Sequence, residues 1–163
     1  MTAVSVASVD VEIEEEAWAR ALPSVADIAR AAALAALPAG PDSNLVILLA
    51  GDAEVSALND QFRGKPTPTN VLSFPAAANP EGHLGDLALA FGVCDGEARA
   101  QGKPLADHLR HLVVHGVLHL LGYDHQEQAE GDAMEALERD ILAGLGVPDP
   151  YAEPMKDSST HGA

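Results

Sequence analysis

The sequence predicts a single domain that combines α-helices with β-strands. Its 163 residues are about the length of one domain, and an apolar content of 47% is enough for a sizeable buried core. Short apolar or alternating segments typical of strands are interspersed with longer segments typical of helices. We expect one domain over residues 1–146 and a flexible C-terminal tail over residues 147–163, where Pro and Ser recur.

Four segments have the character of β-strands. Residues 4–13 alternate β-branched and polar side chains, which indicates a half-buried strand at or near a sheet edge. Residues 44–50 (NLVILLA) are continuously apolar, as in a strand covered on both faces. Two shorter apolar strands follow at residues 71–74 and 87–91, separated by a surface loop over residues 76–85.

Five segments are predicted to be helical from their composition, their amphipathic spacing and the Gly or Pro near their ends: residues 24–37, 52–62, 93–101, 104–121 and 126–145. Asp52 is a suitable N-cap for the second helix. Pro104 fits the first turn of the fourth helix, and Gly122 ends it.

The charge distribution limits how the protein can meet a nucleic acid. With 9 basic and 25 acidic residues, the net charge of -16 excludes a polycation that holds nucleic acid by net charge alone. Residues 59–115 are nearly neutral, so only there would an anionic substrate escape strong repulsion. Their basic residues are Arg63, Lys65, Arg99, Lys103 and Arg110.

Three features predict a cytoplasmic protein without a membrane partner. The single cysteine, Cys94, cannot form an intramolecular disulfide, which favours a reducing compartment. The first 16 residues have no basic side chain and end in an acidic cluster, unlike a secretory signal. The longest apolar run, residues 45–50, is far too short to span a bilayer.

The segment HGVLHLLGYDH (residues 115–125) predicts a metal site. His115 and His119 are four residues apart, so on a helix they present two imidazoles on one face. Gly122 ends the helix, so the chain can turn back and bring His125 to the same point. Three nitrogen donors without an evident fourth ligand are typical of catalytic zinc, where water holds the open position.

Two alternatives compete with a catalytic zinc site. The histidines could be core residues, although the surrounding apolar helix would make two unpaired imidazoles costly to bury. A zinc peptidase has the same histidine spacing, but its general base is a Glu after the first His, where this chain has Gly116. A peptidase is therefore the weaker interpretation.

Three further motifs occur in the order found in one known family: Arg63-Gly-Lys, the PTNVLSFP segment at residues 68–75 and the GDLAL segment at residues 85–89. With the histidine motif, they make the chain resemble the YbeY family of bacterial ribosomal-RNA maturation factors over about residues 44–145. Two positions depart from the family pattern. This chain has Phe62 where the family leads us to expect an aromatic residue with a hydroxyl, and Pro66 where it leads us to expect an Asp.

The resemblance implies a zinc-dependent endoribonuclease specific for single-stranded RNA, acting in 3′-end maturation of small-subunit ribosomal RNA and in ribosome quality control. It implies an α+β fold, with about five helices packed on a small mixed sheet of about four strands and the zinc-binding helix buried against the sheet. It makes His115, His119 and His125 ligands of one Zn²⁺ per chain, and Arg63 a catalytic residue. The implied partner is small-subunit RNA, together with ribosomal proteins, and not DNA.

The chemistry of phosphodiester cleavage gives Arg63 a role independently of the family, because a guanidinium stabilises charge on the non-bridging phosphate oxygens. From the residues alone, Arg63 could equally be a solvated cation that interacts with the C-terminal dipole of a helix. Lys65 and Ser73 are candidate substrate contacts, although Ser73 could instead form a hydrogen bond within its strand. His111 and Asp124 could orient the ligand imidazoles, with a turn as the other role for Asp124. A ribosome-assembly factor with a structural metal is the alternative to a nuclease.

Overall fold

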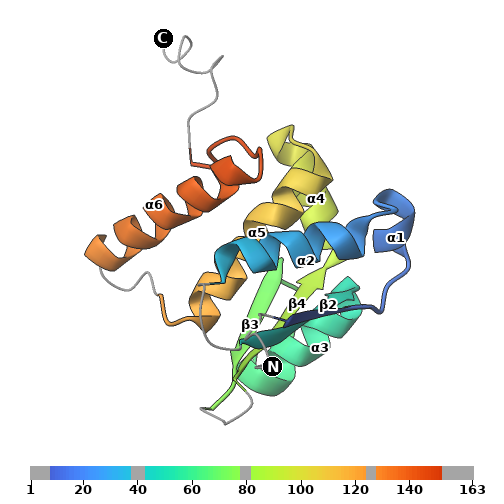
Figure 1. The fold of residues 1–163 in the computed structure, drawn as a ribbon. Helices are drawn as coiled ribbons and strands as arrows, with labels where there is room; N and C mark the ends of the chain where they lie inside the picture. The colour runs from blue at the N-terminus through green and yellow to red at the C-terminus, as the bar shows by residue number, and fades with distance from the viewer. Residues whose placement is uncertain (1–7, 38–42, 78–81, 124–127, 152–163) are drawn as a thin grey trace, which may run out of the picture.

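The computed structural model describes residues 8–37, 43–77, 82–123 and 128–151. Its centre is a four-stranded sheet in the order β1-β2-β4-β3 (Figure 1). The strands are β1 (Ser8–Ile13), β2 (Asn44–Ala50), β3 (Val71–Pro75) and β4 (His83–Ala90). β1, β2 and β4 run parallel, whereas β3 pairs antiparallel with β4 at the sheet edge. The predicted mixed sheet is confirmed, with the first strand at the opposite edge.

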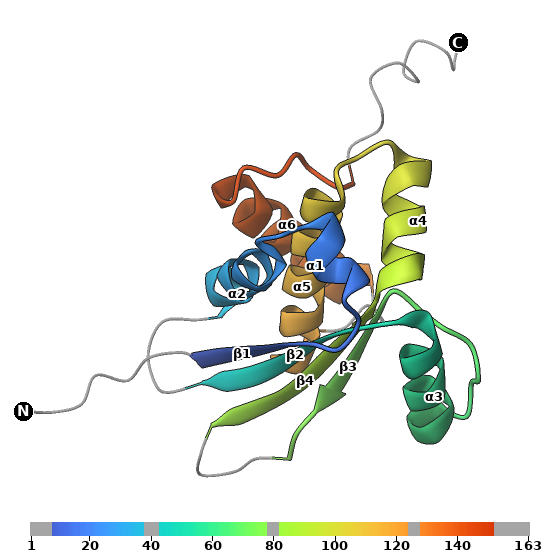
Figure 2. The ribbon, with the colours of Figure 1, turned by 90° about the vertical axis from the view of Figure 1, so that its right-hand side faces the viewer.

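In the described part of the chain, six helices lie around this sheet: α1 (Ala17–Ala21), α2 (Val25–Ala36), α3 (Asp52–Arg63), α4 (Phe91–Gln101), α5 (Leu105–Leu120) and α6 (Gln128–Gly144). Figure 2 shows α2 and α5 on one face of the sheet, with α6 beyond them, and α3 on the opposite face. The α+β class is therefore confirmed.

The histidine helix α5 is buried against the sheet, as predicted, and contributes to the main core. Its residues Leu109, Val113 and Val117 are fully buried, and they belong to one apolar cluster with the buried residues of β2, β4 and α2. Each such side chain contributes roughly 1.5–3 kcal/mol of burial free energy. A smaller cluster lies under α3, where Val55 packs with Leu72 of β3. Apolar packing on the two faces of the sheet therefore fixes α5 on one side of the β3 edge and α3 on the other.

Two features of the fold differ from the sequence prediction. β4 begins at His83 rather than at residue 87, because its polar first half pairs with β2 on one side and β3 on the other. The additional helix, α1, has only five residues and therefore no amphipathic repeat to detect. It is held by Trp18, which is fully buried and donates a hydrogen bond to the carbonyl of Ala50 (3.0 Å).

The predicted N-cap Asp52 has another role. Gly51 is the N-cap of α3, and its N–H donates to Glu54 Oε1 (3.2 Å). Asp52 instead accepts a hydrogen bond from the N–H of Val93 in α4 (3.1 Å). A contact between two helix starts 41 residues apart decides this role, and no local pattern reveals it.

The first residues of the predicted tail are part of the folded structure. Val147 is buried, and the Tyr151 hydroxyl donates a hydrogen bond to Glu138 of α6. The rest of the tail, residues 152–163, lies outside the described residues, and the domain boundary stays a prediction. Among the described residues, none of the helices is long and apolar enough to cross a membrane.

Candidate metal centre

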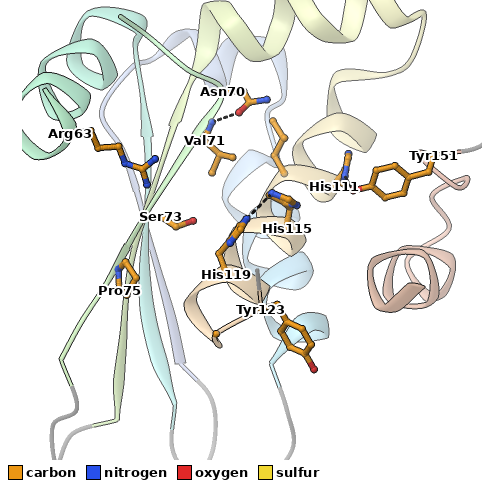
Figure 3. Close-up of a pocket in the computed structure, with 12 residues that line it drawn as sticks. Arg63, Asn70, Val71, Ser73, Pro75, His111, His115, His119, Tyr123 and Tyr151 are labelled. Carbon is orange, nitrogen blue, oxygen red and sulfur yellow. Dashed lines mark hydrogen bonds between the residues drawn. The ribbon is translucent and has the colours of Figure 1, made fainter. Parts of the chain in front are cut away.

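One stripe of α5 opens onto a cavity beside β3. His111, His115 and His119 are only partly buried, whereas most of the residues between them are fully buried. The cavity has a volume of about 580 Å³. Figure 3 shows the residues that line it, which are Arg63, Asn70, Val71, Ser73, Pro75, His111, Leu112, His115, His119, Gly122, Tyr123 and Tyr151.

His115 and His119 face each other through their Nε2 atoms, which are 3.1 Å apart. Two nitrogen ligands of one tetrahedral Zn²⁺ are separated by about 3.3 Å, given zinc–nitrogen bonds of about 2.0–2.1 Å. His115 Nδ1 donates a hydrogen bond to Glu138 Oε2 (2.6 Å). With Nδ1 as the donor, a neutral imidazole has its lone pair on Nε2, the atom of His115 that faces His119, so the two rings fit a shared cation.

Glu138 of α6 is fully buried and supports this arrangement. Its Oε1 accepts a hydrogen bond from the Tyr151 hydroxyl and lies 3.4 Å from His111 Nε2. Burial by itself raises the pKa of Glu138, but the hydrogen bonds from His111, His115 and Tyr151 outweigh burial and lower the pKa to about 2. Glu138 is therefore a carboxylate at neutral pH and accepts a hydrogen bond on each oxygen.

A second possible metal group includes Glu138 as a ligand. One ligand atom each from His111, His115 and Glu138 can be chosen so that all three lie within 4.8 Å of one another. The described residues therefore allow a His/His/Glu group as well as the His115–His119 pair. The two groups share His115 and differ in their other ligands, which are His111 and Glu138 in one and His119 in the other.

Arg63 approaches the cavity from the opposite side of the sheet edge. It is the last residue of α3, which ends at Gly64 in the left-handed conformation (φ 70°). Ser73 of β3 also lines the cavity, and its hydroxyl donates to the carbonyl of Gly116 (3.5 Å). In Figure 3 Arg63 and Ser73 lie across the cavity from His115 and His119. The cavity therefore has a cation on one side and imidazoles on the other.

The structure brings together only some of the predicted site residues. Arg63, Ser73, His111, His115 and His119 line one cavity. Lys65 is exposed on the loop after α3 and is not among the residues that line it. Asp124 and His125 lie outside the described residues, so the third predicted zinc ligand stays a prediction. Gly122 has a φ of 105°, in agreement with its predicted role at the end of the helix.

Sequence reasoning missed Glu138 and Tyr151. The available signal for Glu138 was its position on α6, since it falls one turn after Met134 and one turn before Leu142, both fully buried. A single Glu within an apolar stripe indicates a buried carboxylate with a specific partner. Tyr151 gave no such signal, because its segment has no periodic pattern.

Comparison with known proteins identifies the family. The family model described as Endoribonuclease YbeY matches residues 4–146. The chain belongs to the YbeY family. A protein named Endoribonuclease YbeY from Azorhizobium caulinodans is 50% identical, with 91% of this chain and 98% of that protein covered. One of the same name from Maricaulis maris is 49% identical, with 88% and 91% covered.

A solved structure supports the fold. The solution structure of TM1509 from Thermotoga maritima superposes with a TM-score of 0.53 and covers 89% of this chain and 99% of that protein. At 21% identity this similarity concerns the fold alone. The predicted membership of the YbeY family is therefore confirmed, and the relatives named above carry the name of an enzyme, an endoribonuclease.

Proposed function

We propose that this YbeY-family protein is a zinc-dependent endoribonuclease specific for single-stranded RNA. Its relatives are named Endoribonuclease YbeY, and we assign it to 3′-end maturation of small-subunit ribosomal RNA and to ribosome quality control in the cytoplasm. The observation that carries the proposal is the cavity that joins the Nε2 atoms of His115 and His119, 3.1 Å apart, with the Arg63 guanidinium.

The proposed zinc ligands are His115, His119 and His125. Three imidazoles suit zinc and leave one position for water or substrate. Glu138 is better suited to orient His115 than to bind the metal, because both of its oxygens accept hydrogen bonds. Its 2.6 Å contact with His115 Nδ1 is a hydrogen-bond distance, shorter than the separation of about 3.3 Å between two ligands of one ion. Asp124 would orient a ligand imidazole in the same way.

The side chains around the cavity have separate roles in phosphodiester cleavage. When bound, the zinc ion supplies Lewis acidity toward the phosphate and lowers the pKa of water. Arg63 binds the non-bridging oxygens and stabilises the charge that develops on them. Ser73 of β3 would donate to the phosphate once its hydroxyl turns from the Gly116 carbonyl, a contact of 3.5 Å, and Lys65 contacts the adjoining backbone of the RNA strand. His111 helps to hold Glu138, and through it His115.

The acidic surface shapes the choice of partner. At a net charge of -16 the protein repels free RNA at long range. Ribosomal proteins, which are usually basic, would offset this repulsion, so we propose the small ribosomal subunit as the natural setting of cleavage.

The decisive experiment compares cleavage of a single-stranded RNA with that of its duplex, using purified protein whose metal content is measured. Wild type should contain zinc and cut only the single strand. Arg63→Ala should keep its zinc and lose about 10²–10³-fold in kcat, as when one charge-stabilising donor is removed. Arg99→Ala is the matched control, because Arg99 is an exposed cation on α4 paired with Asp95.

Two further variants distinguish the metal arrangements. His119→Ala should abolish zinc binding and cleavage, whereas Glu138→Gln should lower zinc affinity by about 10–100-fold, as expected for a residue that only orients a ligand. The opposite result, with zinc lost in Glu138→Gln and kept in His119→Ala, would place the metal at His111, His115 and Glu138. Zinc-loaded wild type that cuts no RNA would favour a non-catalytic assembly factor instead.

A further inference from the structure

The chain after α6 folds back and brings Tyr151 to the metal centre. Val147 is buried, and its N–H donates to the carbonyl of Leu142 (2.9 Å). Asp149 accepts a hydrogen bond from Arg139 Nε (3.2 Å) and another from the N–H of Tyr151 (2.8 Å). We call Arg139, Asp149 and Tyr151 the C-terminal clasp.

The clasp fixes the ring of Tyr151 as well as its backbone. The Arg139 guanidinium lies 5.4 Å from the centroid of the Tyr151 ring, within the range of a cation–π contact. The edge of the same ring meets His111, with centroids 5.6 Å apart and planes at 85°. Arg139, Asp149 and His111 therefore hold Tyr151 in one orientation.

In that orientation the Tyr151 hydroxyl donates a hydrogen bond to Glu138 Oε1, while His115 Nδ1 donates to Oε2 (2.6 Å). One donor on each oxygen fixes the rotation of the carboxylate. Among the described residues, the other group near Oε1 is His111 Nε2 at 3.4 Å, too long for a strong hydrogen bond. Tyr151 is therefore the main donor that holds this oxygen.

We propose that Tyr151 is a positioning residue for the metal centre, which sets metal affinity by holding Glu138 in the orientation that directs His115 Nε2 toward His119. The inference rests on the proposed metal site and not on RNA cleavage. Partners one step removed from a ligand typically change metal affinity by 10–100-fold when they are mutated. Tyr151 acts through Glu138, so we expect an effect of about tenfold.

The chain contains a matched control. Tyr123 lines the same cavity, but it is 39% exposed, and in Figure 3 its ring points away from His115 and His119. Tyr123→Phe and Tyr151→Phe remove the same hydroxyl from two sides of one cavity. A general effect of altering the cavity would appear in both variants, whereas the proposed effect requires Tyr151 alone.

The experiment titrates metal-free full-length protein with Zn²⁺ in competition with a chromophoric chelator. Tyr151→Phe should bind one Zn²⁺ per chain about tenfold more weakly than wild type, and Tyr123→Phe should stay within twofold. Asp149→Asn, which weakens the clasp without altering Tyr151 or Glu138, should reduce affinity by a smaller factor. Urea unfolding of each metal-free variant shows whether it is folded before Zn²⁺ is added.

Equal affinities in wild type and Tyr151→Phe would overturn the proposal, as would an equal loss in Tyr123→Phe. If Tyr151→Phe does not fold, the Zn²⁺ affinity of Asp149→Asn tests the proposal instead. An affinity equal to that of wild type would then contradict the role of the clasp. Wild type that binds Zn²⁺ but cuts no RNA would refute the proposed nuclease function and leave this inference intact. Wild type that binds no Zn²⁺ would refute the metal site on which both depend.

Discussion

Gly116 shows how one residue determines the chemistry of α5. A zinc peptidase with the same histidine spacing has its general base at this position, but here the residue faces the sheet. A Cβ at Gly116 would lie 2.8 Å from Leu87 Cδ2 and 3.4 Å from Ser73 Oγ. A side chain as large as Glu would require the side chains of the fully buried Leu87 and of Ser73 to shift. The missing base is therefore linked to close packing of α5 on the sheet, which favours a nuclease over a peptidase.

The packing at Gly116 can be tested against a second helical glycine. Gly116→Ala should lower the free energy of unfolding, because overpacking a core costs about 1–3 kcal/mol and outweighs the gain in helix propensity of about 1 kcal/mol. Gly96→Ala in α4 should raise it by about 0.5–1 kcal/mol, because the added Cβ meets no atom within 4 Å. Urea denaturation measures both, and a change of the same sign in the two variants would contradict this account.

At the scale of elements, the loop between α3 and β3 depends on side chains from its neighbours. Asn59 of α3 donates to the carbonyl of Thr67 (2.9 Å). Asn70, at the end of the loop, donates to Glu97 of α4 (3.1 Å). Glu97 also pairs with Nε2 of the buried His108 in α5 (2.8 Å). Three helices thus hold the loop that follows Arg63 and contains Lys65.

This anchoring predicts the effect of Glu97→Gln. A glutamine has the same shape but no negative charge, so its Oε1 would accept weaker hydrogen bonds from Asn70 and His108. Its NH2 group would also replace the second oxygen that Asn70 contacts (3.4 Å), so the loop should loosen. We expect the free energy of unfolding to fall by about 1–3 kcal/mol, the range for hydrogen bonds to charged groups. The KM for RNA should rise, while zinc content stays at the wild-type value.

Asp95→Asn is the control for Glu97→Gln, since it removes one charge from the same helix. Asp95 pairs with Arg99, whose side chain is 79% exposed, and such surface pairs contribute at most about 1 kcal/mol. An Asp95→Asn variant with the same rise in KM would show that helix charge, not the anchored loop, controls RNA binding. Steady-state kinetics of the two variants separates these explanations.

For the molecule as a whole, His108 links folding to pH. Burial lowers the pKa of His108 below 6.5, and this effect outweighs the opposing hydrogen bond to Glu97. Just below pH 6.5, His108 is therefore protonated in the unfolded chain but still largely neutral in the folded protein. The corresponding stability is present above pH 6.5 and is lost as the pH falls toward the lower pKa of the folded state.

We expect the metal-free protein to lose stability between pH 7 and pH 5, and His108→Gln to lose less over the same range. Glutamine keeps a donor for Glu97 but has no proton to bind in this interval. Urea denaturation at several pH values measures the difference in slope, and equal slopes would mean that His108 does not contribute.

Local patterns in the sequence were sufficient for most elements and for part of the site. The apolar run at residues 44–50 predicted β2, and the spacing of His115 and His119 predicted that their side chains would lie side by side. These predictions succeeded because strand and helix periodicity fix which neighbouring side chains share a face. The family motifs added Arg63, which lines the same cavity.

Tertiary structure alone decided which distant groups complete the site. Glu138 lies 23 residues from His115 and Tyr151 lies 13 residues further along the chain, and neither distance matches a local period. The same holds for the start of β4, where pairing on both sides outweighs the polar sequence of His83–Asp86. The sequence by itself therefore determined the helix and the spacing of its imidazoles. Only the packing of α6 and the chain after it determined what orients them, because the free energy of a buried carboxylate depends on donors that the fold brings from elsewhere.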